Sequence, residues 1–372
     1  MTSTRFTPCA AACAALVLCA APLHAADVSV YGRVDSGVVY QNFSGDSTKD
    51  DAFSMESGLN TASRWGIRGS ERLTDDVSVS FRLENRFASD TGAIKGGRLF
   101  EGSAFLEVSS RTWGELAAGR IAGVNSGSGP WDVQILMDAF GGGTFGTALA
   151  PVKSSRMDNM ITYRSPRAAG LQATLQHSLQ TDSAAKGDES TSDVDRFWAA
   201  GLTWKAGERL NLVAVYEGTT WGRKDAKAPD TSRKVFTVGG NLRIDDVALY
   251  AQAQYFNGVD KLDGFATSSS AAPSSETRNI KGCGLYAGVQ VWFGPSSLQS
   301  MVYWRDYDVK AAADGRTHDG SSLGVAAKYV HRPSKTIDMY AGGGWSQWDR
   351  LSGGRILTDR SFNLFSGVTK YF

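Results

Sequence analysis

Apolar and polar side chains alternate along many short stretches of the chain. In residues 28–40, one set of alternate positions holds Val28 and Val30, and the other set holds Arg33 and Asp35. A β-strand places two such sets on opposite faces. Each stretch therefore predicts a strand with one face suited to lipid and one face suited to water.

The same alternation recurs in sixteen segments of the chain. Most are close to the roughly 9–11 residues that a tilted strand needs to cross a bilayer. The predicted strands are residues 28–40, 61–72, 76–88, 99–109, 112–120, 157–165, 170–180, 196–205, 209–219, 234–243, 246–257, 283–293, 297–307, 321–331, 335–347 and 361–372.

Short and long connections alternate between these segments. Seven connections have two to four residues, and eight are longer and rich in Gly, Ser, Asp and Lys. Bacterial outer-membrane barrels have an even number of strands, short periplasmic turns and longer outer loops. We therefore expect an all-β fold, a 16-stranded antiparallel up-and-down transmembrane β-barrel with long extracellular loops and short periplasmic turns. The rival fold, a soluble β-sandwich, has no need of long polar loops on one side only.

Composition agrees with a barrel. The chain holds 42 Gly, only 9 Pro and 39 aromatic residues (10 Trp, 12 Tyr and 17 Phe), without the runs of Leu, Ala, Glu and Lys typical of helices. Several aromatic residues lie towards segment ends, among them Tyr40, Trp198, Trp304 and Tyr371. Aromatic rings prefer the headgroup level of a membrane, so this placement supports strands that cross a bilayer.

The N-terminus predicts export. Arg5 precedes an apolar run from Ala10 to Ala21, and small residues follow at Ala25 and Ala26. This order is typical of a Sec signal peptide, and the run is too short to be a membrane anchor. We expect a signal peptide at residues 1–25 and a barrel at residues 26–372 in the cell outer membrane. Cleavage after Ala26, or a lipoprotein signal at Cys19, are the alternatives.

Charge excludes one class of partner. Arg5 is the only charged residue of positions 1–25, so the rest of the chain has 38 Lys and Arg (39 − 1) against 38 Asp and Glu. A general nucleic-acid binder shows a basic surplus, so we expect no nucleic-acid partner. Cys283 is the one cysteine after residue 25, which excludes an internal disulfide in the exported chain.

Several motifs resemble those of the general porins of Gram-negative bacteria, in their betaproteobacterial branch. They are the first strand Asp27–Val38, the stretches Ser63–Leu73, Phe81–Glu84, Trp113–Arg120 and Arg156–Pro166, and the terminal Phe372. The resemblance covers the whole exported chain. It implies a homotrimer of 16-stranded barrels in outer-membrane lipid and lipopolysaccharide, each with a third loop inside its pore. Ala104–Val108 and the pair Ala117 and Ala118 depart from the family pattern, which bears on the trimer contacts.

The longest loop, residues 121–156, is the predicted pore constriction, because a long loop in a compact protein is usually functional. Its acids are Asp132 and Asp138, and the lumen-facing positions of the early strands carry Arg33, Arg64, Arg68, Arg82 and Arg86. The predicted constriction takes its bases from Arg33, Arg64, Arg68 and Arg82. Opposed acids and bases across a narrow point set which solutes pass. Arginines outnumber acids here, and Arg120, Lys153 and Arg156 add to them, so a weak preference for anions is expected. For each arginine, a wall salt bridge to an acid such as Asp35 or Glu84 is an equally good interpretation.

No catalytic or metal-binding constellation stands out. His177 and Ser178 are adjacent on a strand and point to opposite faces, and no His, Cys or carboxylate cluster has metal spacing. Gly141–Gly146 fits a dinucleotide-binding pattern, but no strand–helix unit surrounds it. We therefore expect no enzyme and no cofactor, but a channel for passive diffusion of ions and small hydrophilic solutes. A substrate-specific channel and a barrel enzyme such as a lipase or protease are the alternatives.

Overall fold

The computed structural model describes residues 27–143, 152–183, 188–222, 231–259, 262–266, 269–271, 277–311 and 315–372. The predicted signal peptide, residues 1–25, lies outside the described residues. Within the described residues, no helix is long and apolar enough to cross a membrane.

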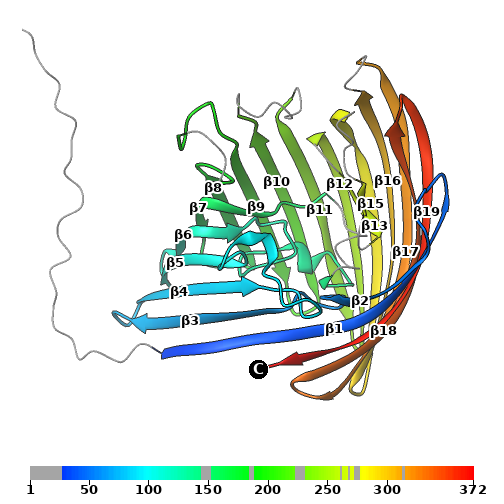
Figure 1. Ribbon diagram of the computed structural model, residues 1–372. Helices are drawn as coiled ribbons and strands as arrows, with labels where there is room; N and C mark the ends of the chain where they lie inside the picture. Colours follow the sequence, from blue (N-terminus) through cyan, green and yellow to red (C-terminus); the bar gives the residue numbers. More distant parts are fainter. Residues whose placement is uncertain are drawn as a thin grey trace, which may run out of the picture.

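The chain forms a ring of antiparallel strands (Figure 1). The strands are β1 Asp27–Gly45, β2 Ala52–Ser57, β3 Arg64–Arg72, β4 Val77–Arg86, β5 Ser103–Ser110, β6 Gly114–Ala122, β7 Arg156–Arg164, β8 Leu171–Ser178, β9 Arg196–Ala206, β10 Leu210–Thr220, β11 Arg233–Ile244, β12 Val247–Val259, β13 Leu262–Ala266, β14 Ser269–Ala271, β15 Thr277–Phe293, β16 Ser296–Ala311, β17 Thr317–Ser334, β18 Ile337–Ser352 and β19 Arg355–Tyr371. Two short 3-10 helices, η1 Lys95–Gly97 and η2 Gln134–Leu136, lie in connections.

The ring closes into a barrel. Seventeen strands make one sheet, in which β2 and β3 both pair with β1 and so share one position of the wall. The wall therefore has sixteen positions, and β1 pairs with β19 from Arg33–Tyr371 to Gly45–Asp359. The predicted all-β, 16-stranded antiparallel barrel is confirmed. A closed barrel leaves no open sheet edge, which a bilayer requires.

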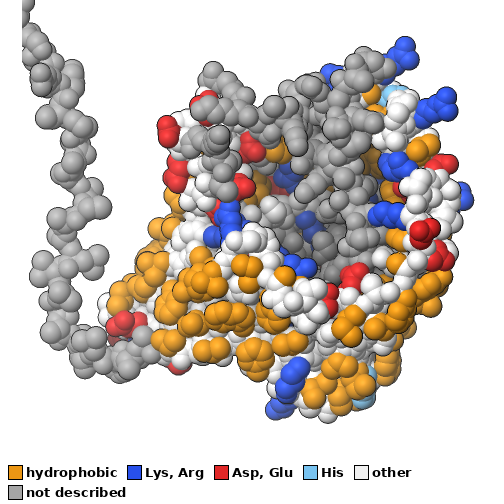
Figure 2. All heavy atoms as spheres, in the orientation of Figure 1, with side chains coloured by type: hydrophobic (Ala, Val, Ile, Leu, Met, Phe, Trp, Pro, Cys, Tyr) orange, Lys and Arg blue, Asp and Glu red, His pale blue; other side chains and the backbone are white. Residues whose placement is uncertain are grey.

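The outer surface of the barrel is apolar. Large side chains such as Val30, Leu106, Leu175, Leu249 and Leu364 point outwards, with 45–65% of their surface exposed in several cases, for example 65% for Val30 and 47% for Leu249. Figure 2 shows hydrophobic side chains gathered over the outside of the wall, with charged side chains at the upper rim. Outward apolar positions alternate with inward polar ones, as a strand that separates lipid from water requires.

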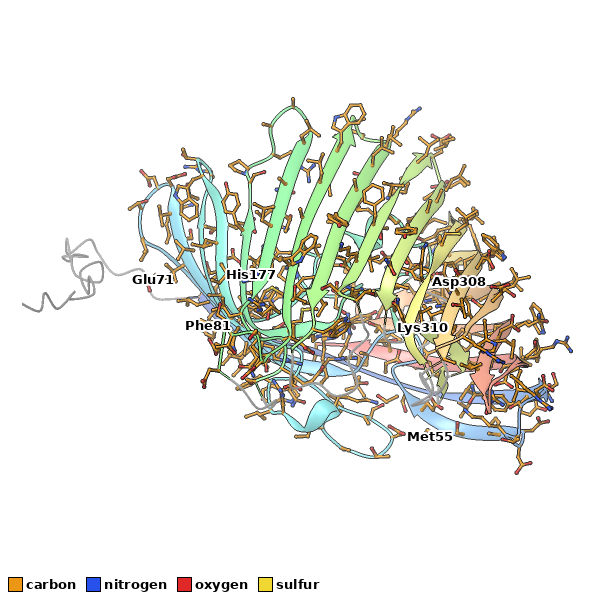
Figure 3. All side chains as sticks on the ribbon, turned by 90° about the horizontal axis from the view of Figure 1, so that it is seen from above. Met55, Glu71, Phe81, His177, Asp308 and Lys310 are labelled. Atoms are coloured by element: carbon orange, nitrogen blue, oxygen red, sulfur yellow. The ribbon has the colours of Figure 1, made fainter. Side chains whose placement is uncertain are left out.

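The two ends of the barrel differ. Seen from above, Glu71 lies at the end opposite to Asp308 and Lys310 (Figure 3). Glu71 is beside one of the short turns, whereas Asp308 and Lys310 lie beside a longer connection. The wall is also uneven, since β8 has 8 residues and β17 has 18.

Several predicted loops are partly strand, including 308–320, which β16 enters as far as Ala311 and β17 from Thr317. β2 occupies part of the predicted loop 41–60, and the small hairpin of β13 and β14 lies within the predicted loop 258–282. The predicted loop 348–360 is wrong, because β18 and β19 extend until only Gly353 and Gly354 connect them. Their φ angles of 57° and 72° are those of a tight hairpin turn, which glycine adopts without strain. These extensions mix charged residues with apolar ones such as Trp348, Leu351 and Ile356, and the apolar positions do not recur with a period of two.

Candidate functional site

The described parts of one long connection, residues 123–143 and 152–155, lie inside the barrel. The connection leaves β6 at Ala122 and enters β7 at Arg156, and Figure 1 shows its described parts within the ring of strands. Hydrogen bonds tie it to distant parts of the wall. The Gln176 Oε1 atom of β8 accepts the Val124 N–H at 2.6 Å, and the Asn241 Nδ2 of β11 donates to the Leu136 carbonyl at 2.7 Å. These two anchors lie on β8 and on β11, which is three positions further round the wall.

Apolar side chains seat this connection. Trp131 and Met137 are buried against Met160, Phe197 and Val213 of the wall, in one of the clusters inside the barrel. In a second cluster, Phe140 packs with Val39, Leu59, Tyr340 and Phe365. These wall residues point into the lumen, where water would otherwise meet them. Burial of this apolar surface holds the connection in place, at about 25 cal/mol per Å² removed from water.

The two predicted acids both lie in this connection, and the carboxylate of each accepts hydrogen bonds from the protein. The Asp132 carboxylate accepts the backbone N–H groups of Ser126 at 3.0 Å and Gly127 at 2.7 Å. Burial raises the pKa of the Asp132 carboxyl to about 6, against the opposing effects of the Gly127 N–H and the Lys153 ammonium. Asp132 thus shapes a turn of its own loop.

Asp138 is the second predicted acid, and its side chain is buried against the wall. The Tyr286 hydroxyl of β15 donates to Asp138 Oδ1 at 2.8 Å and accepts the Ala139 N–H at 2.8 Å. The Lys153 ammonium lies 3.7 Å from Asp138 Oδ2. Asp138 therefore fastens the middle of the connection to β15.

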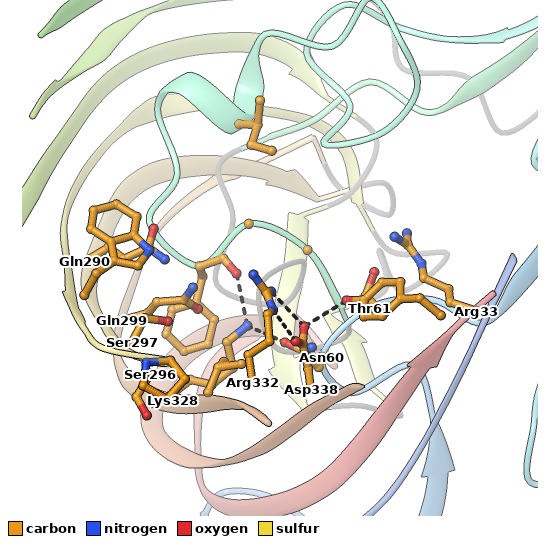
Figure 4. A pocket seen from close by; sticks show the side chains of 18 of the residues that line it. Arg33, Asn60, Thr61, Gln290, Ser296, Ser297, Gln299, Lys328, Arg332 and Asp338 are labelled. Atoms are coloured by element: carbon orange, nitrogen blue, oxygen red, sulfur yellow. Dashed lines mark hydrogen bonds and ion pairs between the residues drawn. The ribbon is translucent and has the colours of Figure 1, made fainter. Parts of the chain in front are cut away.

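A buried lysine holds the tip of the connection. The Lys328 ammonium of β17 donates to Asn60 Oδ1 at 2.9 Å and to the Phe140 carbonyl at 3.2 Å (Figure 4). It also lies 4.9 Å from the centre of the Phe140 ring. Lys328 is only 3% exposed, and these contacts replace the water that its charge loses.

Two wall residues, Gln254 and Arg233, hydrogen-bond the part of the connection that leads back to β7, at Val152 and Lys153. Gln254 of β12 accepts the Val152 N–H at 2.7 Å and donates to the Val152 carbonyl at 2.9 Å. Arg233 of β11 donates to the Lys153 carbonyl at 3.2 Å and forms a buried ion pair with Glu217 at 2.6 Å.

The predicted arginines form two tiers on one wall. In the first tier, Arg33 of β1 is directly opposite Arg64 of β3, and Arg64 is directly opposite Arg86 of β4. In the second tier, Arg68 is directly opposite Arg82. The structure therefore brings the four arginines predicted at the constriction to one wall, together with Arg86, which was also expected to face the lumen.

Neutralisation of these arginines is incomplete. Arg64 pairs with Glu84 at 3.0 Å, as the salt-bridge interpretation expects. Arg33 donates to the Ala62 carbonyl at 3.2 Å, and Arg68 donates to Ser29 Oγ at 3.2 Å. Arg82 lies 5.8 Å from the centre of the Tyr31 ring. In the part of the chain that the structure describes, Arg33, Arg68 and Arg82 form no ion pair with a carboxylate.

A network of ion pairs continues along the wall from the first tier. Arg86 and Arg120 lie 3.2 Å and 3.7 Å from the Glu101 carboxylate, and Arg120 bonds Asp158 at 2.6 Å. Arg156 donates to the Gly102 carbonyl at 2.9 Å and has no carboxylate partner among the described residues. Basic groups thus outnumber acidic ones on the wall that faces the connection.

Sequence reasoning missed Lys328 and Tyr286 as site residues. A signal for Lys328 was present, because it is a lone charge at a lumen-facing position of the strand segment 321–331. Tyr286 carried no such signal, because its role depends on where the loop tip lies. Among the described residues, no group of three or more His, Cys, Asp or Glu side chains is placed to hold a metal ion.

Comparison with known proteins gives a consistent set of relatives. A family model described as Gram-negative porin matches residues 11–350. An outer membrane porin protein of Bordetella pertussis is 27% identical over 357 residues, which cover 86% of this chain and 89% of the relative.

Solved structures share the fold at lower identity. An anion-selective porin from Comamonas acidovorans is 18% identical, with a TM-score of 0.67 over 94% of this chain and 100% of that chain. The in-vitro folded trimer form of OmpT from Vibrio cholerae is 14% identical, with a TM-score of 0.60 over 94% of this chain and 100% of that chain.

Proposed function

This chain belongs to the Gram-negative porin family, and on that premise we propose that its lumen passes small anions more readily than small cations. It is an outer-membrane channel for passive diffusion. The observation that carries the proposed preference is the row formed by Arg33, Arg64 and Arg86 on three adjacent wall positions. Like charges directly opposite each other on paired strands are destabilising, so such a row has a cost that folding alone does not explain.

The balance of charge around the row supports the preference. Glu84 and Glu101 offset part of it, whereas Arg33 and Arg156 lack a carboxylate partner within the described part of the chain. The acids of the facing loop are engaged by their own loop and by Tyr286, which leaves the arginine wall as the source of the field. A positive field in a narrow pore lowers the energy of an anion there and raises that of a cation.

The connection between β6 and β7 is the constriction in this proposal. A 16-stranded barrel is wide enough for an aqueous channel, and something inside it must narrow it. The seats of Trp131 and Phe140 on opposite clusters, with the anchors at Gln176 and Lys328, support this role.

Reversal potential in a KCl gradient across a planar bilayer tests the proposal. We expect a potential of the anion-selective sign in the native protein. Arg33→Gln and Arg82→Ala should each move it towards cations, and Asp132→Ala should change the conductance by loosening the loop. A clear cation preference would overturn the proposal. Unchanged conductance and ion preference in both Arg82→Ala and Asp132→Ala would overturn the constriction.

We also propose export through the Sec pathway, with removal of residues 1–25, and assembly as a homotrimer in lipid and lipopolysaccharide. The trimer form of OmpT supports the assembly, because this chain has the same fold. Light scattering of the detergent-solubilised protein measures the mass, and N-terminal sequencing locates the cleavage. A monomeric mass, or an N-terminus at Met1, would contradict the respective part.

Two alternatives have direct tests. A substrate-specific channel would show a current that saturates with one solute, whereas a general channel shows steady conductance across a panel of sugars and organic acids. A barrel enzyme would hydrolyse ester or peptide substrates in an assay of the purified protein.

A further inference from the structure

A cavity of about 530 Å³ lies inside the barrel, between the loop tip and the end with the short turns. Its walls come from β15 to β19 and from β1, and Phe140, Gly141 and Gly142 of the loop cover it. The volume is in the range of small-molecule sites, roughly 300–1,000 Å³. Figure 4 shows Arg33 on one side of the cavity and Gln290 and Gln299 on the other, with Arg332 and Lys328 between them.

The basic side of the cavity carries excess positive charge. Arg332 is neutralised by Asp338, whose Oδ1 it bonds at 2.6 Å. Arg33 bonds the Ala62 carbonyl, and Lys328 bonds the Asn60 amide and the Phe140 carbonyl, which are neutral acceptors. One carboxylate therefore faces three cationic side chains among the lining residues, which favours a ligand with a negative charge.

The other side offers amide and hydroxyl groups beside an aromatic ring. The Gln299 Oε1 atom is buried and accepts no hydrogen bond from the described residues. The Gln290 Oε1 atom accepts one long bond, from the Tyr250 hydroxyl at 3.4 Å. Ser297 and the Trp292 indole line the same side. A buried acceptor without a donor costs free energy. A turn of the Gln299 side chain towards the cavity would let a hydroxyl group of a solute donate to this atom and remove that cost.

From these two sides we propose that the cavity is a weak binding site for acid sugars, monosaccharides that carry a carboxylate, on their way through the channel. The carboxylate lies on the side of Arg33 and Lys328, and the hydroxyl groups donate to Gln299 and Gln290. The apolar face of the sugar ring packs on Trp292, whose ring is apolar with a polar edge. The proposal deepens the proposed anion channel and rests on its being an open pore. Binding stays weak because a solute that passes must also leave.

Single-channel current in KCl tests this site with three probes, namely glucuronate, glucose and acetate. Glucuronate should reduce the current in a saturable manner, at a concentration at least several-fold lower than glucose or acetate. Gln299→Leu should raise the half-effect concentration of glucuronate about five-fold, as the loss of one neutral hydrogen bond predicts, and leave the KCl reversal potential unchanged. Arg33→Gln should raise the half-effect concentration of glucuronate more than that of glucose.

Arg68→Gln is the matched control, because it removes the same charge from a lumen-facing arginine that does not line the cavity. It should shift the reversal potential with little effect on the half-effect concentration of glucuronate. Gln290→Leu probes the same amide side if Gln299→Leu does not fold. Equal effects of the three probes, or no response to either Arg33→Gln or the glutamine variants, would overturn the site. Such a result with an anion-selective potential leaves the proposed function standing, whereas a cation-selective channel with saturable glucuronate block overturns the proposed function alone.

Discussion

Individual side chains in the lumen decide the electrostatics of the pore. Arg33, Arg64 and Arg86 lie directly opposite one another across β1, β3 and β4, and Glu84 and Glu101 compensate them only in part. A single substitution on this wall therefore changes the charge that a passing solute meets. The loop that faces the wall is held by a few side chains of its own, and these determine how rigid the narrow point is.

Lys328→Met is expected to loosen the loop tip. The change removes the donor of Asn60 Oδ1 and of the Phe140 carbonyl, and a buried acceptor left unpaired costs about 1–3 kcal/mol. Single-channel recordings should show current that flickers between several levels in place of one. Lys335→Met, on an exposed turn, is the control. One steady level in Lys328→Met would contradict the role of this lysine.

Asp132 predicts a pH dependence of stability. Its pKa is raised to about 6, whereas an unfolded aspartate titrates near 3.9, so the folded protein binds this proton more tightly. The contribution is present below about pH 4 and is lost as the pH rises through about 6. Asp132→Asn should therefore flatten the pH profile of the free energy of unfolding by about 3 kcal/mol, since each pKa unit corresponds to roughly 1.4 kcal/mol.

Urea titrations at several pH values between about 4 and 7 measure that profile. Asp75→Asn, on an exposed turn, controls for the loss of an acid. Parallel profiles of the native protein and Asp132→Asn would show that the Asp132 proton is not linked to folding.

At the level of elements, the strands were predictable and the loop path was not. All sixteen predicted segments coincide with wall strands, because alternation with period two is a local property of each segment. β10 shows the limit. Val213 and Val215 face the lumen although they are apolar, because Trp131 and Met137 of the loop cover them. Ion partners such as Glu84 depend on register between strands, which no single segment reveals.

Tyr286→Phe should raise hydrogen exchange in the loop without affecting the strands. The lost hydroxyl leaves the Ala139 N–H and Asp138 without their partner on β15. A loss of about 1.4 kcal/mol corresponds to roughly ten-fold faster exchange of amides near Ala139. Tyr163→Phe, whose hydroxyl bonds the Trp113 carbonyl on the outside, is the matched control. If the exchange rates of the loop amides are the same in Tyr286→Phe and in the native protein, the Tyr286 hydroxyl does not anchor the loop.

The whole molecule is a wall between lipid and water. Apolar side chains cover its outside, while the inside combines charged tiers with the apolar seats of one loop. Stability therefore depends on the solvent around each outward position as well as on packing.

Leu249→Lys and Leu73→Lys separate these two effects. Both leucines are 47% exposed, but Leu249 lies within β12 and Leu73 beside a turn at the end of β3. A lysine at the bilayer midplane costs roughly 2–4 kcal/mol, and near the interface about 0–1 kcal/mol. Denaturant unfolding from lipid vesicles should show that difference. Equal losses for both variants would show that Leu249 does not lie deeper in the bilayer than Leu73.

Closure of the ring also determines the order in which the barrel folds, because β1 pairs with the last strand, β19. The backbone of Phe372 bonds that of Gly32 in both directions at 3.0 Å, so the first strand waits for the last residue of the chain. Contacts so far apart in sequence form slowly, because the intervening chain must first be brought together. Until then the edge of β1 that will pair with β19 presents unpaired amides. Such an edge can pair with another chain, so each copy is exposed to aggregation until its barrel closes. A chain that lacked Tyr371 and Phe372 would lose the partners of Arg33 and Gly32, and that end of β1 would stay open.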